Sequence, residues 1–119
     1  TARMLDRLKA LGYREVTQER PTLLGPAAQV MRGHEFHYSE IDGGSPAHHT
    51  GVYRLTDRVG VEKAEEGFVV NQTLGSYVHL HFGSCLQIAD NFVGACARWA
   101  VENKTLPGVS NPSRERDTY

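Results

Sequence analysis

The sequence predicts one domain of mixed α and β structure, in which helices flank a middle region of several consecutive strands. Apolar residues recur at helical spacing near the start and again from residue 84 to residue 103. The region between them is rich in β-prone residues and is interrupted by glycine and proline. A chain of 119 residues is long enough to bury one hydrophobic core. These observations favour an α/β or α+β domain. Because the sequence opens without an initiator methionine, we expect a piece of a longer protein.

The composition argues against several classes of protein. Acidic residues number 14 and basic residues 13, which gives a formal net charge of −1, whereas a nucleic-acid-binding protein usually has a basic excess. A hydrophobic content of 39% is typical of a folded domain. No apolar run approaches the ~18 residues of a membrane-spanning helix, and the first residues lack the apolar stretch of a secretory signal. We therefore expect neither nucleic acid nor a membrane as a partner.

The two cysteines, Cys85 and Cys96, both fall in one predicted helix. They would lie about 16 Å apart along its axis at the helical rise per residue, which is too far for a disulfide bond. Free thiols are typical of a reducing compartment. The sequence therefore predicts a cytoplasmic protein without a disulfide framework.

Residues 2–11 have the pattern of an amphipathic helix that ends at Gly12, and residues 13–18 have that of a short strand. Helix, glycine and strand in this order form a common connection in α/β proteins. The predicted apolar face of the helix consists of Met4, Leu5, Leu8 and Leu11.

The middle of the chain is predicted to be a series of strands joined by loops. β-Prone residues predict strands at 30–41, 51–56, 68–70 and 77–82. The connections 19–26 and 42–50 contain glycine and proline, residues 62–66 are expected to form a charged turn or a helical turn, and residues 71–75 join the last two strands.

Residues 84–103 give the clearest helical pattern, and Ser84 and Gln87 have the spacing of a capping box. Residues 104–119 contain two prolines, a glycine and scattered charge, which predicts an exposed tail or linker. We therefore expect a folded part over residues 1–103 and a flexible tail over 104–119. The buried stripe predicted for the helix consists of Leu86, Ala89, Phe92, Val93, Cys96 and Ala100.

Histidines are the first candidates for chemistry. Most histidines in strands are packed or hydrogen-bonded side chains without a catalytic role. His79 and His81, however, are two residues apart in a predicted strand, so their side chains point to the same face. They precede a Gly-Ser turn that opens a helix, and sites in α/β sheets gather at such strand ends. Each histidine could act as a base, an orienting group or a metal ligand.

Two kinds of histidine site are open from the residues alone. The first is a Cys–His pair, in which an imidazole favours the thiolate. Cys85 stands at a strand–turn–helix junction, but Gln87 occupies the position where a nucleophile elbow needs glycine; Cys96 lies inside a helix. The second is a zinc or iron site made by His79 and His81 with a third histidine, His34 or His37. His48 and His49 lie in a Gly/Pro/Ala loop and are expected to be exposed.

Four segments in order resemble the C-terminal end of the cobyrinate a,c-diamide synthase family, over roughly residues 1 to 100. Gly33 to Ser39 reads Gly-His-Glu-Phe-His-Tyr-Ser, and Ser76 to Phe82 reads Ser-Tyr-Val-His-Leu-His-Phe; these two are the most specific. The other two are Leu11-Gly12-Tyr13-Arg14-Glu15-Val16 and Leu23-Leu24-Gly25-Pro26.

The resemblance implies a class I glutamine amidotransferase domain with a flavodoxin-like α/β fold, an open sheet with an inserted strand-rich segment. It also implies an N-terminal ATP-binding domain of the dethiobiotin-synthetase type. In such enzymes a Cys–His site hydrolyses glutamine, and the ammonia attacks a substrate carboxylate activated by ATP and Mg²⁺. The product is an a,c-diamide of cobyrinate or a related tetrapyrrole. Enzymes acting on hydrogenobyrinate, sirohaem and nickel-sirohydrochlorin share these motifs.

By the resemblance, His79 matches the catalytic histidine that activates the cysteine. His81 stands where related triad enzymes have a glutamate, and Glu35 and His37 are candidates for shaping the glutamine site. The family's nucleophilic cysteine elbow and its Gly-rich ATP loop are absent from this sequence, so the polypeptide alone is expected to be inactive. It would need the upstream half of the domain and the N-terminal domain, with Mg²⁺ and ATP bound there. A non-catalytic binding module and a histidine-based metal-binding domain stay as alternatives.

Overall fold

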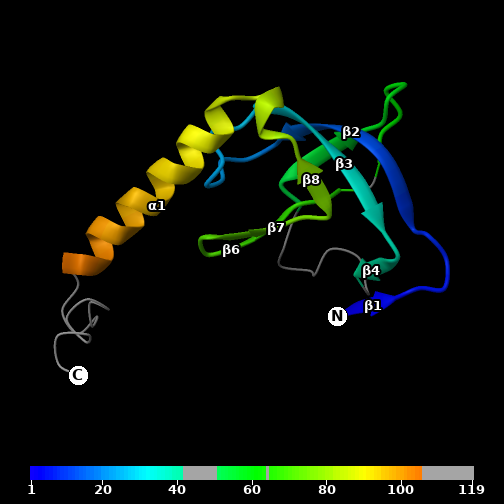
Figure 1. Ribbon diagram of the computed structural model, residues 1–119, viewed down its shortest axis with the longest axis horizontal. Coiled ribbons are helices and arrows are strands. Elements are labelled where there is room, and N and C mark those ends of the chain that lie inside the picture. Colours follow the sequence, from blue (N-terminus) through cyan, green and yellow to red (C-terminus); the bar gives the residue numbers. More distant parts are fainter. Residues whose placement is uncertain (42–50, 64, 106–119) are drawn as a thin grey trace.

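The computed structural model describes residues 1–41, 51–63 and 65–105 (Figure 1). Its centre is a four-stranded antiparallel sheet in the order β5-β2-β3-β8. These strands are β2 (Ala10–Gln18), β3 (Val30–His37), β5 (Tyr53–Thr56) and β8 (Val78–Leu80). β3 pairs with β2 along nearly its whole length, from Ala10 opposite His37 to Thr17 opposite Val30.

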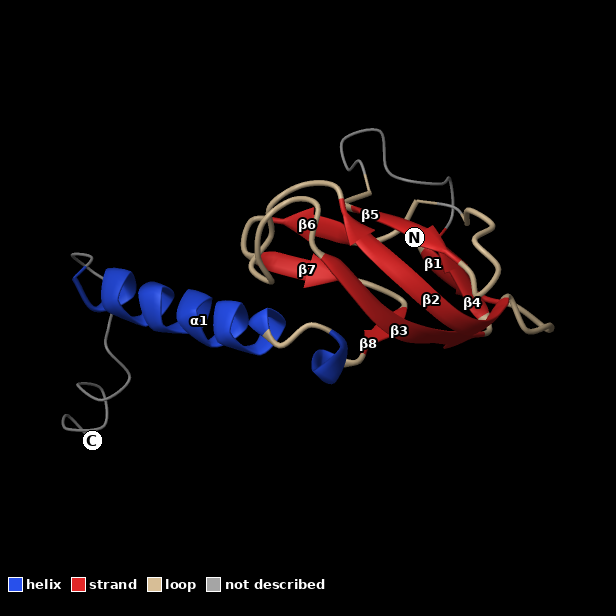
Figure 2. Cartoon of the chain, turned by 90° about the horizontal axis from the view of Figure 1, so that it is seen from above, coloured by secondary structure: helices blue, strands red, loops and turns tan. Residues whose placement is uncertain are grey.

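Two small antiparallel ribbons flank the central sheet. β1 (Ala2–Met4) pairs with β4 (Ser39–Ile41), and β6 (Phe68–Val70) pairs with β7 (Thr73–Gly75). After β8 comes one 3-10 turn, Phe82–Ser84, followed by the helix α1 (Gln87–Thr105). Figures 1 and 2 show α1 extending away from the strands. In the described part of the chain no helix is long and apolar enough to cross a membrane.

The hydrophobic core lies on one face of the central sheet. Alternate residues of a strand point to opposite faces, and β3 accordingly alternates between exposed and buried positions. Val16 stands opposite Met31 on one side and Leu55 on the other, and all three are at most 1% exposed. The remaining core side chains are Leu24, Val52, Tyr53, Val78 and Ile88.

The predicted helix over residues 2–11 is wrong. This segment instead supplies β1, a connection and the start of β2. Its predicted apolar face is largely uncovered by the described residues: Met4 is 76% exposed and Leu11 58%. Backbone pairing of Ala10 onward with β3 decides the conformation, since tertiary pairing overrides weak local helix propensity.

The helix predicted near the C-terminus exists, but its start and its buried face differ from the prediction. Ser84 belongs to the 3-10 turn, three residues before α1, so the capping box is not formed. Leu86 is 73% exposed and Val93 64%, while Ile88 is fully buried. Because α1 projects from the body, the described residues cover only part of its predicted apolar stripe.

The predicted strands in the middle are confirmed, with shorter bounds at 51–56 and 77–82, but the strand predicted at 30–41 is divided at Tyr38 into β3 and β4, which belong to different sheets. β7 was not predicted. It pairs with β6 through a tight hairpin, in which Asn71 has a positive φ of 53°, a conformation that asparagine tolerates better than most residues. The mixed α and β content is also confirmed, and every strand pair among the described residues is antiparallel. The loop 42–50 and residues 106–119 of the tail lie outside the described residues.

Candidate functional site

The central sheet separates the predicted site residues into two groups. Within β3, His34 is half-buried and Glu35 is buried, as expected for neighbours on opposite faces. In the register with β8, His34 stands opposite His79, and Glu35 stands opposite Val78. Residues directly opposite each other share a face. His79 and His34 therefore lie on the outer face, whereas Glu35 lies on the inner face, which carries the core.

The outer face presents a row of three rings from three strands. Tyr13 of β2 is paired with His34 of β3, which is paired with His79 of β8. The rings of Tyr13 and His34 meet edge to face, with centroids 5.3 Å apart and planes at 73°. His79 is exposed, so its imidazole is accessible to a group that approaches this face. An accessible neutral imidazole can take a proton from a thiol or orient a polar substrate.

The segment that follows His79 is tied to β3 by hydrogen bonds. The backbone N–H of His81 donates to the carbonyl of Arg32 (2.8 Å). The hydroxyl of Ser84 accepts from the N–H of Arg32 (2.9 Å) and donates to the carbonyl of His81 (2.6 Å). His81 is exposed like His79. These bonds hold the end of β8 and the 3-10 turn in a defined place against β3.

The inner face carries a chain of charged hydrogen bonds. The carboxylate of Glu35 accepts from Nε of Arg14 (2.8 Å) and contacts Nε2 of His37 (2.8 Å). The other ring nitrogen of His37, Nδ1, lies 2.7 Å from the carbonyl oxygen of Ser39. Both ring nitrogens of His37 thus lie within hydrogen-bond distance of an oxygen atom. Buried charges that are paired in this way are stable only as a set.

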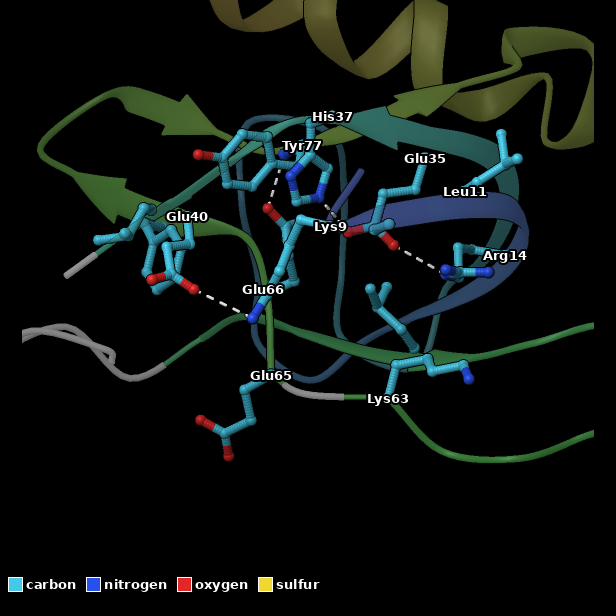
Figure 3. Close-up of a pocket in the computed structure, with 14 residues that line it drawn as sticks. Lys9, Leu11, Arg14, Glu35, His37, Glu40, Lys63, Glu65, Glu66 and Tyr77 are labelled. Carbon is cyan, nitrogen blue, oxygen red and sulfur yellow. Dashed lines mark hydrogen bonds and ion pairs between the residues drawn. The ribbon is translucent and has the colours of Figure 1, made fainter. Parts of the chain in front are cut away.

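The inner network continues to the start of β8 (Figure 3). The ring of Tyr77 stacks on His37, with centroids 3.8 Å apart and planes at 10°, and its hydroxyl lies 2.8 Å from that of Ser39. The carboxyl of Glu66 accepts from the N–H of Tyr77 (2.6 Å) and from the hydroxyl of Ser76 (2.5 Å). Residues 76 and 77, which lead into β8, are therefore held from the inner side.

A cavity of about 560 Å³ opens beside this network. It holds side chains of both charges, as Figure 3 shows. Lys9 on its wall pairs with Glu40 at 3.0 Å. Burial raises the pKa of Glu66 above its usual value, with a further contribution from the nearby Glu35, while the hydrogen bonds from Ser76 and Tyr77 act in the opposite direction. The cavity can accept a small zwitterionic group or solvent.

The structure does not form the other sites that the residues left open. His37 lies on the inner face and His34 and His79 on the outer, and the described part of the chain brings no three histidine, cysteine or acidic side chains together as metal ligands. The three-histidine zinc or iron site is therefore wrong as drawn from the sequence. His48 and His49 lie outside the described residues.

Both cysteines are free thiols, as predicted. Cys85 lies between the 3-10 turn and α1, whereas Cys96 lies within α1. The prediction that both cysteines belong to one helix is therefore wrong. Cys85 packs against the core, and its thiol lies 3.5 Å from the side-chain oxygen of Gln87. Cys96 is exposed on α1. Among the described residues neither thiol forms a hydrogen bond with a histidine, which fits ordinary small apolar residues.

The sequence did not predict Arg14, Glu66 and Tyr77 as members of the site. Strict alternation with the buried Val16 along β2 would have placed Arg14 on the inner face, where a charge needs a partner. Glu66 had no signal of its own, because its contacts come from residues ten and eleven positions away.

Comparison with known proteins gives one family. Residues 3–85 match the CobB/CobQ-like glutamine amidotransferase domain. A cobyrinate a,c-diamide synthase of Leptospira interrogans is 41% identical over 100 residues, which cover 82% of this chain and 22% of that protein. Those of Priestia megaterium (39% over 97 residues) and Thermoplasma volcanium (37% over 94) each cover 79% of this chain and 20% of their own length. The chain thus spans only 20% to 22% of these relatives. No solved structure gives a significant match.

The buried ion pair predicts a large effect on stability. Arg14→Met should lower the free energy of unfolding by about 3 kcal/mol, because it leaves the Glu35 carboxylate buried with one partner fewer. Arg54→Met is the matched control, since Arg54 forms an exposed pair with Glu19 at 3.0 Å and should cost less than about 1 kcal/mol. Urea unfolding measures both. Equal losses in the two variants would contradict a buried network.

The raised pKa of Glu66 predicts a pH dependence. A carboxyl that holds its proton more tightly when folded contributes stability at low pH, and that contribution is lost as the pH rises above the usual value of 4.5 and through the folded pKa. Glu66→Gln removes the titration. The stability of this variant relative to the unsubstituted chain should therefore rise with pH across that window. Unfolding by urea at several pH values measures the difference, and a flat or falling difference would show that Glu66 is ionised in the folded chain.

Proposed function

Because the chain belongs to the CobB/CobQ-like glutamine amidotransferase family, we propose that it is the C-terminal part of that domain in an ATP-dependent a,c-diamide synthase. The substrate would be cobyrinate or a related tetrapyrrole, as the names of the similar relatives suggest. The observation that carries the proposal is the exposed imidazole of His79, on a face of the sheet that is separate from the core. The reaction class would be that of a carbon–nitrogen ligase with glutamine as amide donor.

His79 is the general base of this proposal. A cysteine from the upstream half of the domain would give its proton to the His79 ring, and the thiolate would attack the side-chain amide carbon of glutamine. The protonated ring would then return the proton to the leaving nitrogen, which departs as ammonia. Water would cleave the remaining thioester to glutamate. His81, two residues further along the chain and also exposed, would contact glutamine. Replacing His81 should therefore raise the KM for glutamine in the glutamine-dependent amidation reaction.

The rest of the enzyme must come from other sequence. The flavodoxin-like open sheet of a class I amidotransferase would be supplied by the upstream half, and the antiparallel sheet described above would be its strand-rich companion. Residues of this chain do not fit Mg²⁺ and ATP, because the sequence lacks a Gly-rich loop ending in Lys-Ser/Thr. Both would bind the N-terminal domain. Two free cysteines favour a cytoplasmic location.

Glu35 and His37 shape the site from beneath the sheet. They lie on the face of the sheet opposite to His79, so a glutamine bound beside His79 would be separated from both side chains by the sheet. Their hydrogen bonds and the stacking on Tyr77 instead support the strand that carries His79. We assign both residues to the structure of the glutamine site rather than to a chemical step.

The base assignment predicts a split between two reactions of the intact enzyme. His79→Ala should reduce glutamine-dependent amidation by roughly a hundredfold or more, because general-base catalysis contributes about 10²–10⁴-fold. Amidation with added ammonia should be largely retained, since it bypasses glutamine hydrolysis. Product formation with each nitrogen source measures the split.

Val59→Ala serves as control, because Val59 is 79% exposed in the turn after β5, the strand at the opposite edge of the sheet from β8, and should leave both reactions unchanged. If His79→Ala leaves glutamine-dependent amidation intact, or reduces both reactions equally, His79 is not the base. The chain would then be better described as a non-catalytic binding module.

A further inference from the structure

We infer that His34 is a positioning residue for His79. Its ring, on the neighbouring strand, would hold the His79 imidazole in the orientation in which it takes the thiol proton. The inference rests on the proposed function, since it takes His79 to be the base. It assigns a purpose to a residue of the Gly-His-Glu-Phe-His-Tyr-Ser motif that does not itself touch the reacting atoms.

The first support is the register. His34 and His79 are direct partners in the antiparallel pair of β3 and β8. Directly opposite residues have Cβ atoms about 4.5–5.5 Å apart and share a face, so the two side chains start from adjacent positions on the outer face. Tyr13 meets His34 from its other side at 5.3 Å. In the register His34 stands between Tyr13 and His79, and the contact with Tyr13 limits the movement of the His34 ring on the side away from the base.

The second support is Gly33, the residue before His34. A Cβ at this position would lie 2.6 Å from the carbonyl oxygen of His79 and 2.6 Å from Cγ1 of Val78. Real Cβ contacts are not this short, so any side chain at position 33 would push β8 away. The backbone at Gly33 has no unusual φ. Glycine is required at this position because a side chain would collide with β8. The glycine lets β8 lie close enough to β3 for His34 to act on His79.

The third support is that the backbone of β8 is already held. The N–H of His81 donates to the carbonyl of Arg32, and the N–H of Arg32 donates to the hydroxyl of Ser84, which fixes the residues after His79 against β3. Glu66 fixes Tyr77 before it. With the backbone defined on both sides, the freedom that remains at His79 is rotation of its side chain. In catalytic Cys–His pairs a third group commonly orients the base, and His34 is placed to do so.

His81 and Glu35 are less suited to this task. A Cβ on Gly83 would lie 2.6 Å from Cε1 of the His81 ring, which places that ring against the 3-10 turn. Glu35 is on the opposite face and is engaged with Arg14 and His37. Among the residues that the structure describes on β3, His34 alone is the register partner of His79.

The test uses the intact synthase. His34→Ala should lower kcat of the glutamine-dependent reaction by roughly ten- to a hundredfold, the size expected when a catalytic group is misplaced by about 1 Å. The KM for glutamine and the ammonia-dependent rate should change little. His34→Phe keeps a ring at the position opposite His79 and should restore most of the lost kcat. Phe36→Ala is the control, because Phe36 is 49% exposed two residues further along the same face.

The outcomes separate this inference from the proposed function. If His79→Ala abolishes glutamine-dependent amidation while His34→Ala matches the unsubstituted enzyme, His79 remains the base and the positioning by His34 is refuted. An equal loss of both reactions in His34→Ala, without rescue by phenylalanine, would also refute it, since it would indicate a general loss of structure. If His79→Ala has no effect, the proposed function itself fails.

Discussion

The pairing of β3 with β2 and β8 determines the rest of the structure. β3 is central, and its register places each residue opposite a defined partner on both sides. Because side chains alternate between faces, one short motif serves two environments. Its even-numbered positions face outward beside His79, and its odd-numbered positions face the core. A slip of one residue would exchange the two sets, burying His34 and exposing the Glu35 carboxylate.

The inner ion pairs give that register its specificity. Arg14 and Glu35 are each 8% exposed, and isolated charges at such positions are unfavourable. They are stable here because Arg14, Glu35 and His37 meet in one arrangement. Through Tyr77, and through Glu66 next to it, the same arrangement reaches the strand that carries His79. The structural support of the proposed base therefore comes from the face opposite to the base itself.

Local patterns predicted the strands well and the chain's first segment poorly. The β-prone runs around Val30 and Val78 became strands, because their alternation matches a half-buried sheet. Residues 2–11 failed, because their apolar residues fit a helix as well as they fit an edge ribbon, and only the pairing of Ala10 with His37 decides between the two. His79 was predicted as a site residue through its motif. The motif did not reveal that Glu35 and His37 face away from His79, because no sequence pattern reports which strands become neighbours.

The central claim is that glutamine chemistry takes place on the outer face, at His79. The most direct measurement is an experimental structure of the intact enzyme whose catalytic thiol has reacted with an alkylating glutamine analogue. We expect the modified sulfur to lie on the outer face. The His79 ring should lie within about 3 Å of that sulfur, or of the analogue's atom that occupies the place of the leaving nitrogen. A modified sulfur on the inner face, beside Glu35 and His37, would contradict the account.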